Sequence, residues 1–291
     1  MSTLKDELLL AKQHSYALGH FNFSDSTQFN AIADVALELN VPILLGVSEG
    51  EKKFIGIENA LALVRAARKA RGAKLFLNLD HGHSIEACKE AIDLGFDSVM
   101  FDGSHLPYEE NLAKTKEVVE YARKVGEKQE RYILVEGELG YIGSSSKLLD
   151  EVPEDAGLEK TTPEQAQDFV AKTGVDILAP SVGNIHGMLK GASNPELDTA
   201  LIAQIRKAVP DTFLVLHGGS GIKDDEFKLA IKNGINIVHI NTEIRKAYRF
   251  TLEETLQNKP EEVAPYKFLS DAKEAVKKQV QKRVELFTLA K

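Results

Sequence analysis

The chain has 291 residues, of which 43% are hydrophobic and 27% charged, the balance of an ordinary globular protein. Its formal net charge of −8 argues against a general nucleic-acid binder, because such proteins carry a basic face. No stretch approaches the roughly 18 apolar residues of a membrane span, and the amino terminus lacks a secretory cleavage pattern. We therefore expect a cytoplasmic protein without nucleic-acid or membrane partners. A few local donors would still suffice to hold an anionic substrate.

Eight short apolar or β-branched runs recur along the chain, and longer stretches with helical spacing separate them. Strands that are buried on both faces read as continuous apolar runs, and alternation with helices implies parallel crossovers. Eight such units predict an α/β protein with a (β/α)8 TIM barrel, because a doubly wound open sheet usually has fewer strands. The runs lie at residues 17–23, 42–48, 75–81, 98–104, 132–140, 177–183, 213–219 and 235–241.

The helical stretches between these runs predict the outer layer of the barrel. They lie at residues 26–40, 57–70, 84–95, 111–128, 162–174, 194–209 and 224–234. From Lys246 onward we expect extra C-terminal helices that pack on the barrel or on a neighbouring subunit. No low-complexity linker divides the chain, so we expect one domain over residues 1–291. The single cysteine, Cys88, excludes an intramolecular disulfide and is predicted to be a small core residue.

Polar residues gather at the carboxyl ends of the eight runs, which is the face where barrels of this kind build their active sites. The third run ends in Asp80 and His81. Because adjacent strand residues point to opposite faces, both can face inward only if the strand has already ended there. The predicted mouth consists of Asn22, Ser24, Ser48, Asp80, His81, Asp102, Ser104, Glu136, Glu138, Asn184, His186, His217, Gly218, His239 and Asn241.

Five of the eight histidines lie at or just beyond strand ends, and three of them adjoin glycines in DHG, IHG and LHGG. Three imidazoles from different strands can converge on one Zn²⁺ and leave a position open for substrate. The spacing therefore predicts His81, His186 and His217 as metal ligands. Asp80, beside one ligand, is either a general acid or base or a carboxylate that orients an imidazole.

Glycine-rich loops follow the sixth and seventh runs, as GNIHGMLKG at 183–191 and HGGSG at 217–221. The loops after strands seven and eight form the usual phosphate site of such barrels, where backbone N–H groups and a helix start donate hydrogen bonds. Ser220 and Thr242 would add hydroxyl donors, and Lys190 would add a positive charge.

Eight segments together carry a family resemblance. They are GHFNFSD after the first strand, VSEG at 47–50, LDHG at 79–82, SVMFDGSHLPYEENLAKTKEVVEYA at 98–122, EGELG at 136–140, VGNIHG at 182–187, LHGGSG at 216–221 and NTE at 241–243. In this order they resemble the class II metal-dependent ketose-bisphosphate aldolases. The resemblance implies a zinc lyase that cleaves fructose or tagatose 1,6-bisphosphate into dihydroxyacetone phosphate and glyceraldehyde 3-phosphate. Co²⁺, Mn²⁺ or Fe²⁺ are alternatives to Zn²⁺.

The resemblance also implies roles for individual residues. It makes His81, His186 and His217 the zinc ligands, and it places Asp102 and Glu138 at a secondary position of the metal. Asp80 is implied to exchange a proton with the C4 hydroxyl of the sugar. Phosphate or substrate binding is expected of Asn22, Ser48, Gly187, Lys190, Gly218, Gly219, Ser220, Asn241 and Thr242.

Two further partners follow from the same resemblance. Carbonyl oxygens near Gly187 and Gly218 are implied to hold a monovalent cation, Na⁺ or K⁺. The family and the helical tail also predict a homodimer or homotetramer.

Two departures from the family pattern bear on mechanism. His239 stands where the family usually has an asparagine that contacts the enediolate, and we predict that His239 donates a hydrogen bond there. A metal contact or a different substrate preference are the alternatives. The loop after the fifth run has serines where the family has acids. Asp150, Glu151, Glu154 and Asp155 follow further on, and either one of them protonates the enediolate or the loop is an ordinary solvated surface.

Three other functions compete with this interpretation. A Schiff-base aldolase needs an inward lysine at a strand end, and none of the eight runs has one there. The pair His81–Gly82–His83 suggests a metal-dependent hydrolase, although that class carries such a pair on its first strand. A non-catalytic phosphosugar-binding relative is the third alternative, because of His239 and the serine-rich loop.

Overall fold

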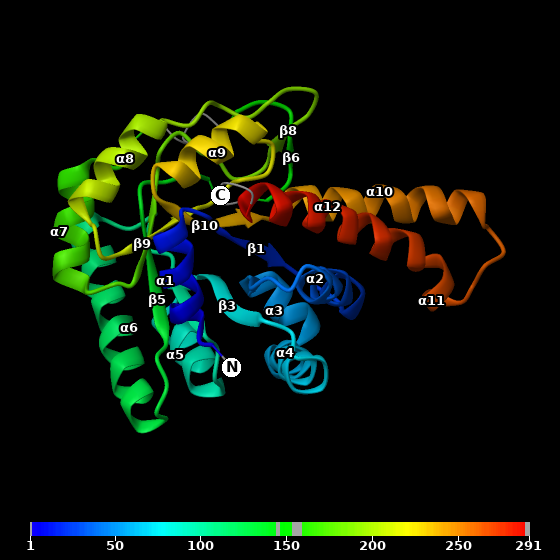
Figure 1. Cartoon of the computed structure of the whole chain (residues 1–291), viewed down its shortest axis with the longest axis horizontal. Helices are drawn as coiled ribbons and strands as arrows, with labels where there is room; N and C mark the ends of the chain where they lie inside the picture. Colours follow the sequence, from blue (N-terminus) through cyan, green and yellow to red (C-terminus); the bar gives the residue numbers. More distant parts are fainter. Residues whose placement is uncertain (1, 144–145, 153–158, 289–291) are drawn as a thin grey trace.

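The computed structural model describes residues 2–143, 146–152 and 159–288. Eight parallel strands close into a barrel in which each strand pairs with its neighbours along the chain and the last pairs with the first (Figure 1). All eight predicted runs form these strands, so the predicted TIM barrel is confirmed. The strands are β1 (Leu18–Asn22), β2 (Ile43–Val47), β3 (Leu75–Gly82), β4 (Ser98–Phe101), β5 (Leu134–Leu139), β7 (Ile177–Pro180), β9 (Phe213–Leu216) and β10 (Ile235–Ile240).

Seven crossover helices form the outer layer, and local signals in the sequence set their ends. Asp25 accepts hydrogen bonds from the N–H groups of Thr27 and Gln28 and so begins the first of them. Gly95 ends another at a φ of 106°, which a glycine adopts without steric cost. The helices are α2 (Ser26–Glu38), α4 (Ile57–Arg71), α5 (Ile85–Leu94), α6 (Tyr108–Lys128), α7 (Pro163–Thr173), α8 (Thr199–Ala208) and α9 (Asp224–Lys232).

One predicted helix boundary is wrong, because helical spacing at 194–209 placed the start of α8 too early. Asp198 caps α8 by accepting from the N–H of Leu201. Asn194 lies outside the helix, and its amide donates to the carbonyls of Gly187 and Ser220 at 2.9 Å each. Asn194 thus ties together two loops of the barrel mouth.

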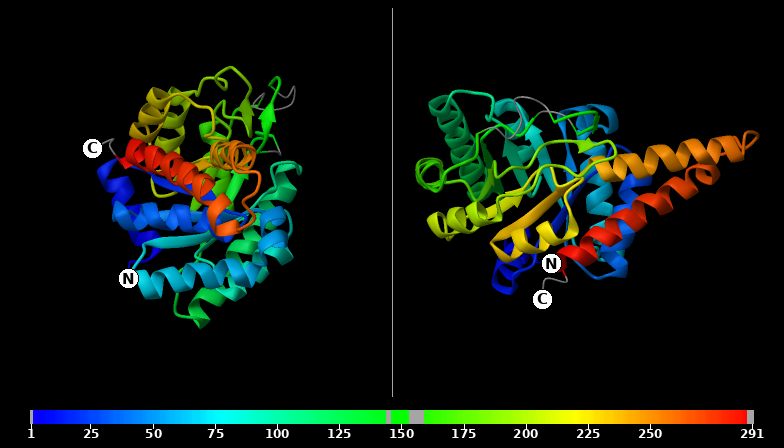
Figure 2. Two further views of the ribbon diagram at one scale, coloured as in Figure 1. Left: turned by 90° about the vertical axis from the view of Figure 1, so that its right-hand side faces the viewer. Right: turned by 90° about the horizontal axis from the view of Figure 1, so that it is seen from above.

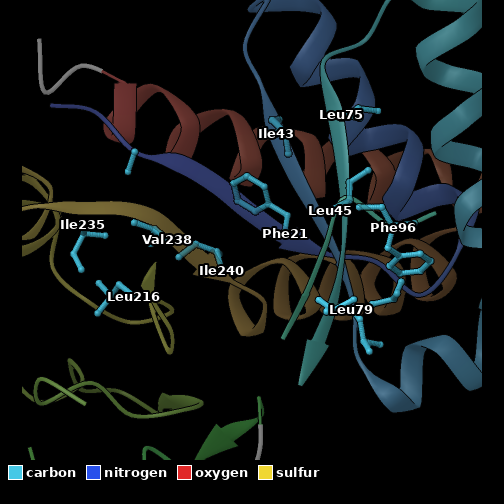
Figure 3. Close-up of a cluster of buried hydrophobic side chains, with 14 of the residues drawn as sticks. Phe21, Ile43, Leu45, Leu75, Leu79, Phe96, Leu216, Ile235, Val238 and Ile240 are labelled. Carbon is cyan, nitrogen blue, oxygen red and sulfur yellow. The ribbon is translucent and has the colours of Figure 1, made fainter. Parts of the chain in front are cut away.

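Strand residues alternate between the helix layer and the barrel interior, as a pleated strand requires. Phe21, Leu45 and Leu79 belong to the main buried cluster that strands and surrounding helices share, and Figure 3 shows this layer. Cys88 lies in the same cluster and is fully buried, as the sequence predicted.

The amino-terminal end of the barrel is closed by a helix that the sequence analysis did not predict, α1 (Leu4–His14). Thr3 caps α1 in a reciprocal capping box with Asp6. A second apolar cluster joins the buried face of α1 to inward-facing strand residues. We call this cluster the floor. Its residues are Leu4, Leu8, Ala11, Leu18, Leu44, Phe76, Leu134, Ile177, Ala179, Phe213, Val215 and Ile237.

The predicted C-terminal helices are present as α10 (Thr242–Asn258), α11 (Pro265–Phe268) and α12 (Ser270–Thr288). α10 and α12 form a hairpin that projects beyond the barrel, with α11 near its tip (Figures 1 and 2). α12 runs back to the barrel and packs on α2 and β1.

Short elements at the mouth were also missed by the sequence analysis. The helix α3 (Glu49–Ile55) follows β2 directly. The two-residue strands β6 (Leu148–Leu149) and β8 (Met188–Leu189) pair with each other and so join the loops after β5 and β7. Among the described residues, no helix combines the length and apolar character that a bilayer crossing needs.

Candidate active site

Above the floor, the inward-facing positions of the same strands carry polar side chains. β1, β3 and β5 each contribute two such residues at alternate positions, and all of them are buried. Burial of so many polar groups is costly unless they are paired or bind a ligand. These inward residues are His20, Asn22, Asn78, Asp80, Glu136 and Glu138.

Asp80 and His81 both line the cavity at the mouth, although β3 continues through Gly82. The structure therefore corrects the expectation that the strand must end before them. His81 has a φ of +52°, and the register between β3 and β4 shifts between Leu79 and Gly82. The left-handed backbone of His81 interrupts the alternation of side chains along β3. Backbone strain of this kind in a residue other than glycine is concentrated at functional sites.

The structure brings His81, His186 and His217 together. Their ring centroids are 4.8, 4.9 and 5.7 Å apart, and one ring nitrogen of each lies within 4.8 Å of the other two. Nδ1–H of His186 donates to the Gly143 carbonyl at 2.6 Å, which leaves Nε2 as the free nitrogen. Nε2 of His217 lies 2.6 Å from the Glu136 carboxylate, which leaves Nδ1 free. Partners of this kind orient imidazoles that bind metals.

The electrostatics of the cluster fit a cation. Burial, with His81 and His217 nearby, lowers the pKa of His186 to about 3, so its imidazole is neutral and able to bind a metal. Burial opposes the charged form of His81 as well, but the Asp80 and Asp102 carboxylates outweigh it and raise the pKa of His81 to about 10. The carboxylates thus favour a positive charge at this point.

Asp102 and Glu138 lie close to the His81 ring. Asp102 Oδ2 is 2.8 Å and Glu138 Oε2 is 3.7 Å from Nδ1 of His81. Burial and the nearby Asp102 carboxylate raise the pKa of Glu138 well above its usual range, and Glu138 Oε2 has no hydrogen-bond partner in the described chain. His81, Asp102 and Glu138 therefore form a second group able to hold a metal.

Asp80 lies beside the three imidazoles. Its Oδ2 accepts a hydrogen bond from the Asn22 amide at 2.7 Å, while Oδ1 is buried and lies 3.4 Å from Nδ1 of His239. Burial raises the pKa of this carboxyl, but His81 and His239 more than offset that and hold it well below its usual range. Asp80 is thus a carboxylate at neutral pH.

His239 faces the same cavity from β10. Burial, with His20 and His217 alongside, lowers its pKa well below the usual range, so its imidazole is neutral. Its Nε2 is buried and has no hydrogen-bond partner among the described residues. Nε2 of His239 can therefore form one hydrogen bond with a bound molecule.

The glycine-rich loops form one wall of this cavity, which is lined by Gly187, Gly218, Gly219, Ser220, Asn241 and Thr242. Gly218 has a φ of 64°, and a Cβ there would lie 2.2 Å from the Ile185 carbonyl oxygen. Only glycine fits so close an approach. α10 begins at Thr242. Asn241 makes no side-chain cap, and the Glu243 N–H donates to the Ser220 hydroxyl at 3.2 Å, so the Thr242 N–H is the first-turn donor that faces the mouth.

An adjoining cavity of about 280 Å³ extends the site toward α3. Ser48 lines it, and so does Arg245, which the sequence analysis missed although it lies two residues after the quoted NTE segment. The Arg245 guanidinium donates to Glu51 at 2.6 Å and to the Ser146 carbonyl at 3.1 Å. Glu51 also accepts from the Asn22 amide, so three successive hydrogen bonds link Arg245 to Asp80 through Glu51 and Asn22.

One predicted binder, Lys190, and two of the four candidate loop acids, Asp150 and Glu151, lie away from the site. Lys190 is exposed, pairs with Asp150 at 2.8 Å and lines neither cavity. That pairing also occupies Asp150, and Glu151 is exposed. Glu154 and Asp155 lie outside the described residues.

Comparisons with known proteins agree with this geometry. The sequence model of the family described as "Fructose-bisphosphate aldolase class-II" matches residues 2–291. Fructose-bisphosphate aldolase of Staphylococcus aureus (strain Mu50) is 38% identical over 290 residues, which cover 98% of this chain and 96% of that protein. The enzyme of the same name from Staphylococcus epidermidis (strain ATCC 12228) is 38% identical over 288 residues, with the same coverage. The crystal structure of the YdjI aldolase from Escherichia coli K12 has a TM-score of 0.82 at 28% identity, covering 99% of this chain and 97% of that one.

The barrel, the imidazole cluster and these similarities define a metal-dependent lyase. The chain belongs to the class II fructose-bisphosphate aldolase family, as the sequence motifs indicated.

Proposed function

We propose that the protein cleaves fructose 1,6-bisphosphate into dihydroxyacetone phosphate and glyceraldehyde 3-phosphate, and catalyses the reverse condensation, with Zn²⁺. The observation that carries this proposal is the convergence of three imidazoles beside a buried, ionised Asp80, in a chain of this family. Tagatose 1,6-bisphosphate is the alternative substrate, because it differs only in configuration at C4.

Zn²⁺ would be held by Nε2 of His186, Nδ1 of His217 and a ring nitrogen of His81. Three nitrogen ligands with an open position are typical of catalytic zinc. When bound, the ion polarises the C2 carbonyl and stabilises the charge left by carbon–carbon cleavage. Asp102 and Glu138 would offer a secondary position, and the Gly187 and Gly218 carbonyls would hold a monovalent cation.

Asp80 would take the proton of the C4 hydroxyl in cleavage and return it in condensation. Its depressed pKa and the Asn22 hydrogen bond keep it ionised and oriented, while Oδ1 stays available to the substrate. His239, 3.4 Å away, would contact the substrate through Nε2. Its Nδ1–H faces the ionised Asp80, so in this proposal Nε2 of the neutral ring accepts a hydrogen bond from a substrate hydroxyl, in place of the donation expected from the sequence.

The glycine-rich wall would bind the phosphate on the dihydroxyacetone side. The N–H groups of Gly218 and Thr242 are suited to it, whereas the Gly219 N–H donates to the His239 carbonyl. The Ser220 hydroxyl accepts from the Glu243 N–H, so its own proton can be donated. Ser48 and Arg245 line the adjoining cavity, where the distal phosphate would lie. Binding of both phosphates would hold the C2 carbonyl of the substrate in a reactive orientation.

Assembly and location are part of the proposal. Exposed apolar residues on the projecting hairpin, Phe250, Leu256, Val263 and Tyr266, support a homodimer or homotetramer. We further infer a cytoplasmic location. The negative net charge and the helices described above are compatible with it.

Cleavage of fructose and tagatose 1,6-bisphosphates, measured side by side with coupled detection of triose phosphate, tests the proposal. EDTA should abolish activity and Zn²⁺ should restore it, and the ratio of the two rates would identify the sugar. No turnover of either sugar by protein with stoichiometric zinc would contradict the proposal and favour a phosphosugar-binding relative. Activity that survives EDTA and yields a borohydride-trapped adduct would instead indicate a Schiff-base enzyme.

A further inference from the structure

A buried polar chain runs from the mouth into the barrel. Asp80 contacts His239, and the His239 ring lies flat against that of His20, with centroids 3.5 Å apart and planes within 3°. Nε2 of His20 lies 3.3 Å from the Asn78 side-chain amide, which in turn bonds Ser98 at 2.8 Å. His20 and Asn78 are completely buried, and neither belongs to the predicted machinery.

The barrel is built to accommodate His20. A Cβ at Gly46 on the neighbouring strand would lie 2.2 Å from Cε1 and 2.6 Å from Nε2 of His20. Position 46 therefore has to be glycine for the imidazole to lie where it does. With the Asn78 amide oriented so that its oxygen faces His20, the oxygen accepts from Nε2–H and the nitrogen donates to Ser98. The ring of His20 is thus fixed at one edge and along one face.

The stacking geometry excludes a metal between His20 and His239. Ring nitrogens bind metals along directions that lie in the plane of the ring. Two parallel rings 3.5 Å apart direct these lone pairs along parallel planes, so the pair cannot converge on one ion. The contact between the two histidines is instead one of ring faces.

We propose that His20 is a positioning residue, which holds His239 in the orientation that presents Nε2 to the substrate. This inference rests on the proposed function. His239 lies between two imidazoles, His20 at 3.5 Å on one face and His217 at 3.9 Å with a 42° tilt. The Asp80 carboxylate contacts the Nδ1 edge of the His239 ring. Without the flat His20 ring against its face, the His239 imidazole can rotate away from its reactive orientation.

Loss of this support should act on the chemical step more than on substrate binding, because the proposed phosphate sites lie elsewhere in the mouth. A misplacement of about 1 Å in a reacting group can cost about 100-fold in rate. We therefore expect His20→Leu, which fills the volume without a flat polar face, to lower kcat about 10- to 100-fold and to change KM less than about threefold. His20→Gln keeps a planar amide and a donor to Asn78, and it should recover kcat to within about threefold of wild type.

A double-mutant cycle with His239→Asn separates positioning from general damage. If His20 acts through His239, then His20→Leu lowers kcat less than about threefold in the His239→Asn background. Equal losses of kcat in both backgrounds would overturn the positioning role. A wild type without aldolase activity would overturn the proposed function as well, so the two failures are distinguishable.

A spectroscopic readout covers the case in which His239→Asn is inactive. In protein labelled with ¹⁵N-histidine, the imidazole signals that His239→Asn removes belong to His239. His20→Leu should shift or broaden those signals and leave those of exposed His105 in place. Unchanged His239 signals, with zinc content and thermal unfolding like the wild type, would refute the inference. His14→Leu on α1 is the matched control, and it should alter neither readout.

Discussion

The floor and the mouth of the barrel interior are made by largely the same strands, yet they differ in polarity. The floor is an apolar cluster that joins α1 to the strands, with the partly buried Tyr16 packed against it. Two residues further along the same strands, the inward side chains become histidines, carboxylates and amides, several with unpartnered buried atoms. Fold stability and chemistry are thus separated along the barrel axis, and substitutions at the two ends should have opposite consequences.

The largest effect is expected at the mouth, from His186→Ala. Removal of one of three proposed metal ligands should lower kcat/KM about 10³-fold or more, because the ion supplies several kcal/mol of transition-state stabilisation. Zinc content per chain and the coupled cleavage assay measure the change. His14→Ala, an exposed histidine on α1, is the control. Full activity of His186→Ala with wild-type zinc content would rule out His186 as a ligand.

At the floor, Leu8→Ala should destabilise the protein by about 2–5 kcal/mol, because it leaves a cavity beneath the barrel. Urea unfolding measures this loss, and kcat and KM of the folded variant should stay at wild-type values. Leu9→Ala on the exposed side of α1 provides the matched control. If Leu8→Ala had wild-type stability or an altered KM, stability and catalysis would not be separated along the barrel axis.

Glu138→Gln should raise the free energy of unfolding, by less than Leu8→Ala lowers it. Burial and Asp102 raise the pKa of Glu138 in the folded protein. Once the pH exceeds the pKa of this carboxyl in the unfolded chain, its ionisation therefore favours unfolding. In protein stripped of metal, the amide should therefore increase the free energy of unfolding at pH 8 by about 1–3 kcal/mol. The gain should vanish near pH 4, where the carboxyl is protonated in both states. Urea unfolding at the two pH values measures it, and a gain that persists at pH 4 would point to packing instead.

The smallest effect is expected from Lys190→Ala. The Lys190–Asp150 pair is exposed, and such pairs contribute about 0–1 kcal/mol. Activity should stay within about threefold of wild type, whereas Arg245→Ala should raise KM well beyond that. A raised KM for Lys190→Ala would restore it as a phosphate ligand and show that loop movement brings it to the site.

The sequence predicted the barrel well because buried parallel strands leave long apolar runs, and its strand ends therefore identified the mouth. It did not predict α1, although Thr3 and Asp6 carry a capping signal. It also missed His20 and Asn78. A single polar residue within an apolar strand gives no periodic signal, and its role depends on pairing between β1, β2 and β10 that arises only when the barrel closes.

His81 illustrates a different limit. Strand alternation correctly raised the question of how Asp80 and His81 could both face inward, but the answer is a left-handed backbone that no local pattern announced. Strain of this kind is maintained by its surroundings rather than by the residue itself.

The pairing of β6 with β8 has a consequence for protein engineering. The loop after β5 contacts His186 twice, through the Ile142 carbonyl to its backbone N–H and through the Gly143 carbonyl to its ring. The two-stranded sheet joins the same pair of loops a few residues further on. A loop graft from a relative would therefore have to exchange residues 141–150 and 185–190 as one cassette, because replacing either alone would unseat a proposed metal ligand.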